Sequence, residues 1–359
     1  MGAQIAVSLL KISMVLFGVL SLAGLLTWAE RKQSALMQDR IGANRASIFG
    51  FRLLGLFHPI ADALKVITKE DFVPDGGSRF LHHLAPFLTL FFALLAFAAI
   101  PFGPTVTMFG VEGPLQAVDL DIGLIFIFAV LSLAVYGVTL GGWVSRSQYA
   151  LLGGLRASAQ MISYEIALGA SVLGVVMVHG TLNLSRIVEG QGGLLLGFLP
   201  SWGIFVQPLG FILFLTAAVA ESKRGPFDLP EGESEIVGYF TEFSGMKWGM
   251  FMMTDFVETV LAAALSVTLF FGGWQFPYLQ AGGFVFPWGA EIGMPAWLVV
   301  AVQVATFAVK VCLMCWFLLL VRWTLPRFRY DQLMRLGWLG LLPLSLLNIF
   351  LTGAVILLL

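Results

Sequence analysis

Charge is scarce in this 359-residue sequence. Asp, Glu, Lys and Arg make up 11% of it and hydrophobic residues 58%, whereas a soluble domain carries about 25% charged residues. The mean hydropathy is +0.91, which indicates an integral membrane protein. The 20 basic and 21 acidic residues nearly cancel to a net charge of −1, so the chain lacks the basic field with which proteins bind nucleic acid.

Cysteine is equally scarce. The two cysteines, Cys312 and Cys315, have a Cys-x-x-Cys spacing that suggests redox or zinc chemistry in a soluble protein. Here they lie inside an apolar segment, no second pair completes a metal site, and two thiols cannot hold an iron–sulfur cluster. No Gly-x-Gly-x-x-Gly dinucleotide motif follows a strand-like pattern. We therefore expect small buried residues at both positions, and no catalytic residue, metal site or bound cofactor on this chain.

Long apolar runs fill most of the chain. A membrane-spanning helix needs about 20 apolar residues, and eight runs reach that length: 5–28, 80–102, 122–143, 160–180, 203–221, 248–272, 297–320 and 336–358. The first run is too long for a signal-peptide core and lacks a basic leader, so we interpret it as a retained span. The sequence predicts an all-α integral membrane protein. We expect a single membrane domain over residues 1–359, with eight transmembrane helices and amphipathic surface helices on its cytoplasmic face.

The basic residues are distributed unequally between the two sets of loops. Seventeen of the 20 Lys and Arg residues belong to the loops after spans one, three, five and seven, and the opposite loops hold only Arg186. The positive-inside rule assigns the first set to the cytoplasm. The long loops 29–79 and 222–247 then face the cytoplasm, and both termini lie on the outer side of the cell inner membrane.

The first long loop contains an amphipathic pattern. Apolar residues recur at helical spacing between Phe49 and Ile67, with polar residues mostly between them. This pattern is typical of a helix that lies at the membrane surface or against a partner, and Pro59 is expected to kink or restart it. A second short amphipathic helix is expected after Pro230, through about Lys247.

The stretch from Glu221 to Glu235 concentrates carboxylates between two apolar segments. Its ionisable residues are Glu221, Lys223, Arg224, Asp228, Glu231, Glu233 and Glu235. Burial and like charges at close range both raise the pKa of a carboxyl group. Such a cluster can therefore hold a proton near neutral pH and pass it on. A solvated acidic loop is the alternative interpretation.

Four acids are placed at membrane depth. Glu165 lies in the fourth apolar segment and Glu221 ends the fifth. Asp255 and Glu258 lie three residues apart in the sixth. A carboxylate at the middle of a bilayer costs about 3 kcal/mol, so each must face the bundle interior or water. A proton or ion path is one interpretation and a structural, hydrogen-bonded acid is the other. Lys310 in the seventh segment is a candidate partner for the acids of the sixth.

A series of motifs follows one another along nearly the whole chain. They are Ala29-Glu-Arg-Lys32 with Gln38-Asp-Arg-Ile-Gly42, Ala61-Asp-Ala-Leu-Lys65 with Thr68-Lys-Glu70, Tyr149-Ala-Leu-Leu-Gly153 with Leu155-Arg156, Ile162-Ser-Tyr-Glu165, Pro226-Phe-Asp-Leu-Pro-Glu-Gly-Glu-Ser-Glu235 with Glu242, and Pro326-Arg-Phe-Arg-Tyr-Asp-Gln-Leu-Met334. In this order they resemble one family, the quinone-chamber membrane subunit of proton-pumping NADH:quinone oxidoreductase, respiratory complex I. The last two motifs are highly specific, whereas Glu-Arg-Lys alone is weak.

The resemblance implies an enzyme subunit that forms the membrane side of a quinone-binding chamber and couples quinone reduction to proton translocation. Quinone, the substrate, would arrive from the bilayer between the first span, the sixth span and the first amphipathic helix. By matched position, the chamber residues would be Glu30, Arg31, Arg224, Asp228, Glu231, Glu233, Glu235 and Arg327. The proton path would begin at Glu165, Glu221 and Asp255, and Glu258, one turn on, could share the role of Asp255. The resemblance further implies that NAD, FMN and iron–sulfur clusters are bound by partner subunits of the peripheral arm, and that other partners belong to the membrane arm.

The sequence departs from the family pattern at three places. Ala43 stands where Pro is usual, Phe57-His58 replaces Leu-Gln, and Asp255-Phe256 replaces a Glu-Tyr pair. The third change shortens a proposed proton carrier by one methylene group. The residues alone also fit two other classes: a secondary cation/proton transporter, or a passive membrane anchor for a soluble complex, such as the related subunit of an energy-converting hydrogenase. An anchor needs no mid-membrane carboxylates, and a transporter needs broken helices around a midplane site. The complete acidic stretch favours the quinone enzyme over the hydrogenase.

Overall fold

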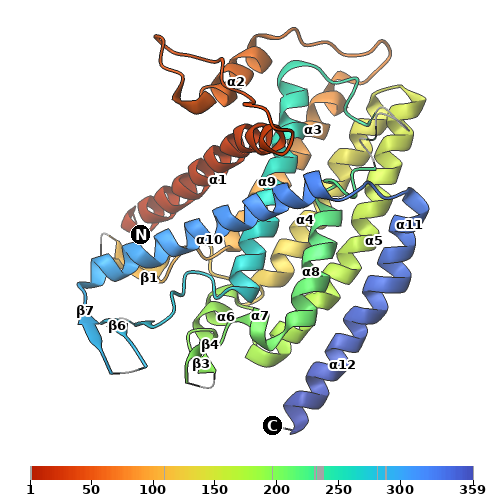
Figure 1. Cartoon of the computed structure of the whole chain (residues 1–359). Coiled ribbons are helices and arrows are strands. Elements are labelled where there is room, and N and C mark those ends of the chain that lie inside the picture. The colour runs from red at the N-terminus through yellow and green to blue at the C-terminus, as the bar shows by residue number, and fades with distance from the viewer. Residues whose placement is uncertain are drawn as a thin grey trace.

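The computed structural model describes residues 2–108, 110–195, 197–229, 232, 238–280, 282–287 and 289–358. Its long helices form an upright bundle with two inclined helices beside it (Figure 1). In the described part, seven helices are long and apolar enough to cross a membrane. They are α1 (Gly2–Met37), α3 (Arg79–Leu95, continued by the 3-10 helix η2, Ala96–Ala99), α4 (Gly123–Val144), α5 (Gln148–His179), α9 (Gly245–Phe270), α10 (Ala296–Thr324) and the C-terminal helix Tyr330–Leu358. The all-α membrane fold class is confirmed.

The predicted fifth span is a shorter and broken helix. α7 (Gly203–Val206) ends at Gln207, and α8 (Pro208–Glu221) begins with a proline. Proline lacks an N–H donor and is tolerated in the first turn of a helix but not in its interior, so the helix restarts at this point. The 14 residues of α8 rise about 21 Å, which is less than the hydrocarbon core of about 30 Å. The count of eight spans therefore stays a prediction.

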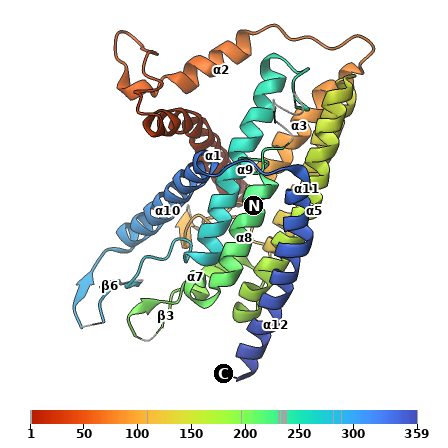
Figure 2. The same cartoon turned by 45° about the vertical axis from the view of Figure 1, so that its right-hand side comes forward.

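α9 is the central helix. Every residue from Thr254 to Phe270 is buried, and α1, α3, α8 and α10 all pack against it. A helix that is buried around its whole circumference needs neighbours on every side, and α9 has them. The acids Asp255 and Glu258 on this helix are therefore inside the protein. The views in Figures 1 and 2 show α9 between the inclined pair and the rest of the bundle.

The inclined pair consists of α1 and α10, which lie beside each other in both views (Figures 1 and 2). Both helices contact α9, and both leave large apolar side chains exposed, such as Phe17 and Trp316. Outward apolar side chains suit a helix surrounded by lipid, because lipid tails are as apolar as these side chains.

The C-terminal helix has three parts. α11 (Tyr330–Arg335) and α12 (Leu342–Leu358) are joined by a π-helical turn, η3 (Leu336–Leu341). The wide turn brings Gly337 against the buried ring of Tyr164, where a side chain at position 337 would meet ring atoms at 3.3 Å. The Tyr164 hydroxyl donates a hydrogen bond to the Leu333 carbonyl at 2.7 Å, which fixes the C-terminal helix to α5.

The surface helix α2 (His58–Thr68) lies at the end of the molecule that Figure 1 shows at the top. Pro59 is in its first turn, so a new helix begins beside the proline, at His58, as the expected restart there implies. The expectation of one helical pattern from Phe49 onward is wrong for the part before Pro59. There Phe49, Leu53 and Leu54 have positive φ, and the only helical turn is the short η1 (Leu53–Gly55).

The second amphipathic helix, expected after Pro230, is not present in residues 238–244, which form turns before α9 begins at Gly245. Its first part, Pro230, Glu231 and residues 233–237, lies outside the described residues.

Short hairpins lie toward the opposite end of the molecule (Figure 1). β1 (Thr105–Met108) pairs antiparallel with β2 (Val111–Pro114), Thr105 opposite Pro114, and β3 (Leu194–Leu195) pairs with β4 (Leu199–Pro200). β5 (Leu279–Gln280), β6 (Gly283–Val285) and β7 (Glu291–Gly293) form a three-stranded sheet in that order. The helix α6 (Leu184–Gly190) packs near them against α9.

Lys310 of α10 caps this end of α9. Its ammonium group donates hydrogen bonds to the carbonyls of Phe271, Gly273 and Gln275 at 2.7, 3.1 and 2.6 Å, and it lies 4.4 Å from the centre of the Trp202 ring. Carbonyls at a helix C-terminus have no partner within the helix, and a cation there is favourable. The expectation that Lys310 pairs with an acid of the sixth segment is therefore wrong.

Candidate functional site

Glu30 joins three segments at the α2 end of the molecule. Its carboxylate lies 3.0 Å from Arg224 Nη1 and 2.9 Å from Arg322 Nη1. Glu30 is on α1, Arg224 follows α8, and Arg322 is in the last turn of α10. Hydrogen bonds between charged groups at this distance are stronger than neutral ones. Glu30 therefore ties both inclined helices to the acidic stretch, and we call this arrangement the Glu30 clamp.

The Arg224 side chain is held on a second side. Its guanidinium carbon lies 4.0 Å from the centre of the Phe256 ring on α9, within the range of a cation–π interaction. The side chain is only 9% exposed. The clamp therefore has a fixed cation beside the central helix.

A second tie joins the acidic stretch to the motif before α11. Arg327 Nη2 lies 3.1 Å from Asp228 Oδ2, the Phe227 and Phe328 rings stack with centroids 5.3 Å apart, and the Phe328 N–H donates to the Pro226 carbonyl. The two most specific sequence motifs are therefore in direct contact. Burial raises the pKa of the Asp228 carboxyl, while the positive charges of Arg327 and Arg322 oppose this rise.

A cavity of about 1000 Å³ lies between α1, α2 and α9. Its charged part includes Glu30, Arg31 and Asp62, and Arg31 pairs with Asp62 at 2.7 Å across the α1–α2 junction. Apolar side chains such as Leu20 and Met253 line much of the rest. Ligand sites in proteins have volumes of about 300–1000 Å³ and combine an apolar lining with a few polar groups. We call this space the chamber cavity.

The acids of α9 are buried beside a lysine. Lys223 Nζ lies 3.6 Å from Asp255 Oδ1 and 3.5 Å from Glu258 Oε2. The three side chains are 1%, 8% and 7% exposed. Close opposite charges favour the ionised forms, whereas burial disfavours them. We call Asp255 and Glu258 the acid pair.

Glu221 and Glu165 continue from the acid pair across the bundle. A cavity of about 20 Å³, here called the relay cavity, is lined by Glu221, Ser222 and Glu258 among apolar side chains. Glu221 interacts electrostatically with both Glu258 and Glu165. The carboxylate of Glu165 on α5 accepts a hydrogen bond from the Ser132 hydroxyl on α4. The four predicted path acids thus lie in one continuous group.

The structure brings together most of the predicted site residues. Glu30 and Arg224 meet in the clamp, Asp228 and Arg327 in the second tie, and Arg31 lines the chamber cavity. Glu231, Glu233 and Glu235 lie outside the described residues.

Three further residues take part that sequence reasoning did not assign to the site. Arg322 completes the clamp, Lys223 pairs with the acid pair, and Ser132 binds Glu165. Lys223 was visible as one of only two cations in the acidic stretch. Nothing in the sequence singles out Ser132, because its role depends on how α4 packs against α5.

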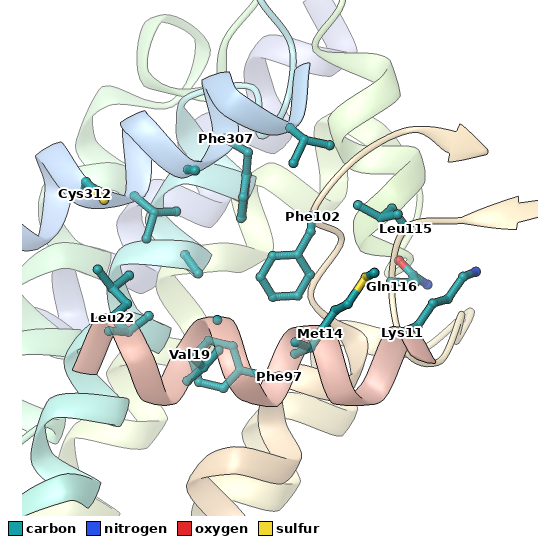
Figure 3. A pocket seen from close by; sticks show the side chains of 17 residues that line it. Lys11, Met14, Val19, Leu22, Phe97, Phe102, Leu115, Gln116, Phe307 and Cys312 are labelled. Atoms are coloured by element: carbon teal, nitrogen blue, oxygen red, sulfur yellow. The ribbon is translucent and has the colours of Figure 1, made fainter. Parts of the chain in front are cut away.

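A separate cavity of about 420 Å³ lies between α1, α9 and α10, toward the N-terminal end of α1. Figure 3 shows that its lining is almost wholly apolar, with Phe102 and Phe307 facing the space and Lys11 at one end. The Lys11 ammonium donates to the Pro114 carbonyl at 2.7 Å. We call this space the outer cavity. None of the predicted site residues lines it, so the outer cavity is distinct from the chamber cavity.

Comparison with known proteins gives a consistent match over nearly the whole chain. A sequence model of the family described as NADH dehydrogenase matches residues 10–353. An H-type subunit of NADH-quinone oxidoreductase from Geobacter metallireducens is 45% identical over 99% of this chain and 98% of its own length. An H-type subunit from Geobacter sulfurreducens is 46% identical over 98% and 97%. The H-type subunit of NADH-quinone oxidoreductase from Thermomicrobium roseum is 44% identical over 94% and 92%.

Proposed function

Because this chain belongs to the NADH dehydrogenase family, we propose that it is the H-type membrane subunit of an NADH:quinone oxidoreductase, respiratory complex I. In this role it forms the membrane side of the quinone-binding chamber and couples quinone reduction to proton translocation. The observation that carries the proposal is the chamber cavity, which combines a long apolar lining with a charged part at Glu30 and Arg31. A quinone has the matching chemistry, a polar head on an apolar tail.

The chamber cavity lies between α1, α2 and α9, the three elements between which the family resemblance implies quinone access. The apolar tail rests against the apolar lining of α1 and α9. The quinone head lies toward Glu30, Arg31 and the neighbouring Arg224. The guanidinium groups of the two arginines can donate hydrogen bonds to the carbonyl oxygens of the head. Apolar burial holds the tail in place, and the polar groups orient the head.

Protons move from the chamber into the membrane through the buried acids. Quinone reduction to quinol takes up protons as well as electrons, so the charge beside Asp228 and the acid pair changes with each turnover. The acid pair, Glu221 and Glu165 form a continuous series of carboxyl groups. A change in charge at one end alters the proton affinity of the next group, because charges interact strongly at low dielectric.

The remaining components belong to other subunits. Cys312 and Cys315 are the only cysteines, and no group of three or more His, Cys, Asp or Glu among the described residues is placed to hold a metal. As the family resemblance implies, we assign NAD, FMN and the iron–sulfur clusters to partners in the peripheral arm. The chain sits in the cell inner membrane with both termini outward, and its cytoplasmic loops are covered by partners.

A photoreactive quinone tests the proposal in membranes that contain the assembled complex. The expected result is covalent labelling of α1 or α9 residues that line the chamber cavity, such as Leu20 or Met253, which excess natural quinone suppresses. Gly24→Leu, which places a side chain in the chamber cavity, should reduce this labelling. Labelling confined to the outer cavity, or labelling that quinone does not suppress, would contradict the proposal.

A further inference from the structure

We propose that Lys223 is a further member of the proton path, which keeps the acid pair in a state that carries a single exchangeable proton. This inference rests on the proposed function, since it adds a residue to the same path. Lys223 lies outside every motif that carried the family resemblance. Its place in the path follows only from the geometry around α9.

The position of Lys223 is fixed by the turn that follows α8. Its φ is +54°, in the left-handed region that side chains other than glycine seldom adopt. This turn lies directly after Glu221, the last residue of α8. The Lys223 ammonium lies between the two carboxylates of the acid pair, 3.6 Å from one and 3.5 Å from the other. A strained residue with a buried charge needs compensation from its surroundings, and the acid pair supplies it.

The charges of these three residues do not balance. One ammonium and two carboxylates leave one net negative charge when all three are ionised. Apart from the Lys223 ammonium, the described residues supply no hydrogen-bond donor to Asp255 Oδ1 or to either Glu258 oxygen. A buried charge without a partner is strongly unfavourable, and two neighbouring carboxylates resist joint ionisation. The favourable state therefore has one carboxylate ionised against Lys223 and the other protonated.

The other charged groups around the acid pair are consistent with this state. Arg224 and Glu221 lie near it at the end of α8, and Asp228 approaches from the acidic stretch. Arg224 shares the Glu30 carboxylate with Arg322, and Asp228 is paired with Arg327. Among the described residues, Lys223 is the cation in ion-pair contact with both carboxylates of the acid pair.

The relay cavity connects the acid pair to Glu221. Its volume of about 20 Å³ is sufficient for about one water molecule, which needs about 10–15 Å³ and at least two polar partners. Glu258, Glu221 and Ser222 supply such partners. In the transfer step the Glu258 O–H bond breaks and its proton passes to the water, while a proton of the water passes to the Glu221 carboxylate. Lys223 remains an ammonium group throughout. After the transfer, the carboxylates of Glu258 and Asp255 both pair with this ammonium group.

The test uses Lys223→Met in the assembled complex, because methionine nearly preserves side-chain length and removes the charge. Quinone reduction and proton pumping should fall about ten-fold or more at neutral pH, a change that corresponds to about 1.4 kcal/mol. Without the cation both carboxylates hold their protons more tightly. The activity that remains should therefore have its optimum at a higher pH than in the wild type.

The double variant Lys223→Met/Asp255→Asn separates charge balance from a merely structural role. It removes one carboxylate together with the cation and leaves Glu258 as the carboxylate beside the relay cavity. Its activity should be several-fold higher than that of Lys223→Met, and its pH optimum should return toward that of the wild type. Lys247→Met is the matched control, since Lys247 is also a buried lysine in an ion pair, with Asp71 at 2.8 Å. It should leave the pH profile of the assembled complex unchanged.

Two results would overturn the inference. The first is a Lys223→Met complex with the same rate of quinone reduction and the same pH profile as the wild type. The second is a double variant whose activity is no higher than that of Lys223→Met. If Lys223→Met does not assemble, the charge-balanced double variant must do so, and its failure would also refute the inference. Glu221→Gln in parallel separates this inference from the proposed function. If Glu221→Gln pumps normally, the path itself is wrong, whereas a defective Glu221→Gln beside a normal Lys223→Met refutes only the role of Lys223.

Discussion

Replacing Glu30 by glutamine removes the negative charge of the Glu30 clamp and keeps the length of the side chain. In the wild type the Glu30 carboxylate lies 3.0 Å from Arg224 and 2.9 Å from Arg322, and these two arginine side chains are 9% and 26% exposed. Removing one member of a buried ion pair costs about 3–5 kcal/mol, because the remaining charge stays buried without a partner. Arg322 is partly accessible to solvent, and glutamine retains one acceptor oxygen. The lower end of this range, about 3 kcal/mol, is therefore expected.

The assay compares Glu30→Gln with Glu112→Gln, an exposed residue of the β1–β2 hairpin. Resistance of the assembled complex to heat or urea and quinone reduction per assembled complex are measured for both. Glu30→Gln should weaken the complex and lower quinone reduction. NADH oxidation by an artificial acceptor upstream of the quinone should remain normal. An exposed substitution changes stability by less than about 0.5 kcal/mol. If the two variants behave alike, the clamp does not support the chamber.

Other predictions follow from the cavities, the α9 cap and the orientation of the chain. Gly24→Leu should raise KM for long-tailed quinone several-fold with little loss of stability, because a Cβ atom added at Gly24 meets no atom within 4 Å. Gly18→Leu, equally unobstructed but beside the outer cavity, is the control and should leave KM unchanged. Lys310→Met should lower the heat resistance of the complex, because three carbonyls lose a charged donor, and the folded state should lose about 2–4 kcal/mol of stability. Unchanged heat resistance would contradict this prediction and show that water replaces the Lys310 ammonium group. In intact cells without the two native cysteines, an impermeant thiol reagent should label Glu291→Cys and spare Asp75→Cys, and the reverse pattern would refute the proposed orientation.

Much of the fold could be predicted because membrane-spanning helices consist of long apolar runs, which can be recognised in the sequence. The limits of this approach are visible at α5, which begins at Gln148 although its apolar part was expected from residue 160. The first turns of α5 contain Gln148 and Arg156, and the apolar criterion omits such polar turns. The break between α7 and α8 was missed for the opposite reason, since Gln207 and Pro208 lie inside a run that is otherwise apolar up to Glu221.

The candidate site could be predicted in its residue types but not in its pairings. Arg224 and Arg327 were both expected at the chamber, yet one pairs with Glu30 and the other with Asp228. Periodicity gives no information on such distant pairings. Lys310 was expected to neutralise the acids of α9, whereas Lys223 does so. Both lysines were compatible with the pattern, and only the packing of α8 and α10 on α9 distinguishes them.

Proton transfer through the buried carboxyl groups is the central claim, and Glu221→Gln tests it most directly. Glutamine keeps the size and hydrogen-bonding capacity of Glu221 but cannot take up a proton. In membranes with matched amounts of assembled complex, quinone reduction and proton pumping should both fall strongly. NADH oxidation by an upstream artificial acceptor should stay normal, and Glu221→Asp should keep part of the activity. A Glu221→Gln complex that assembles and pumps protons like the wild type would contradict the account.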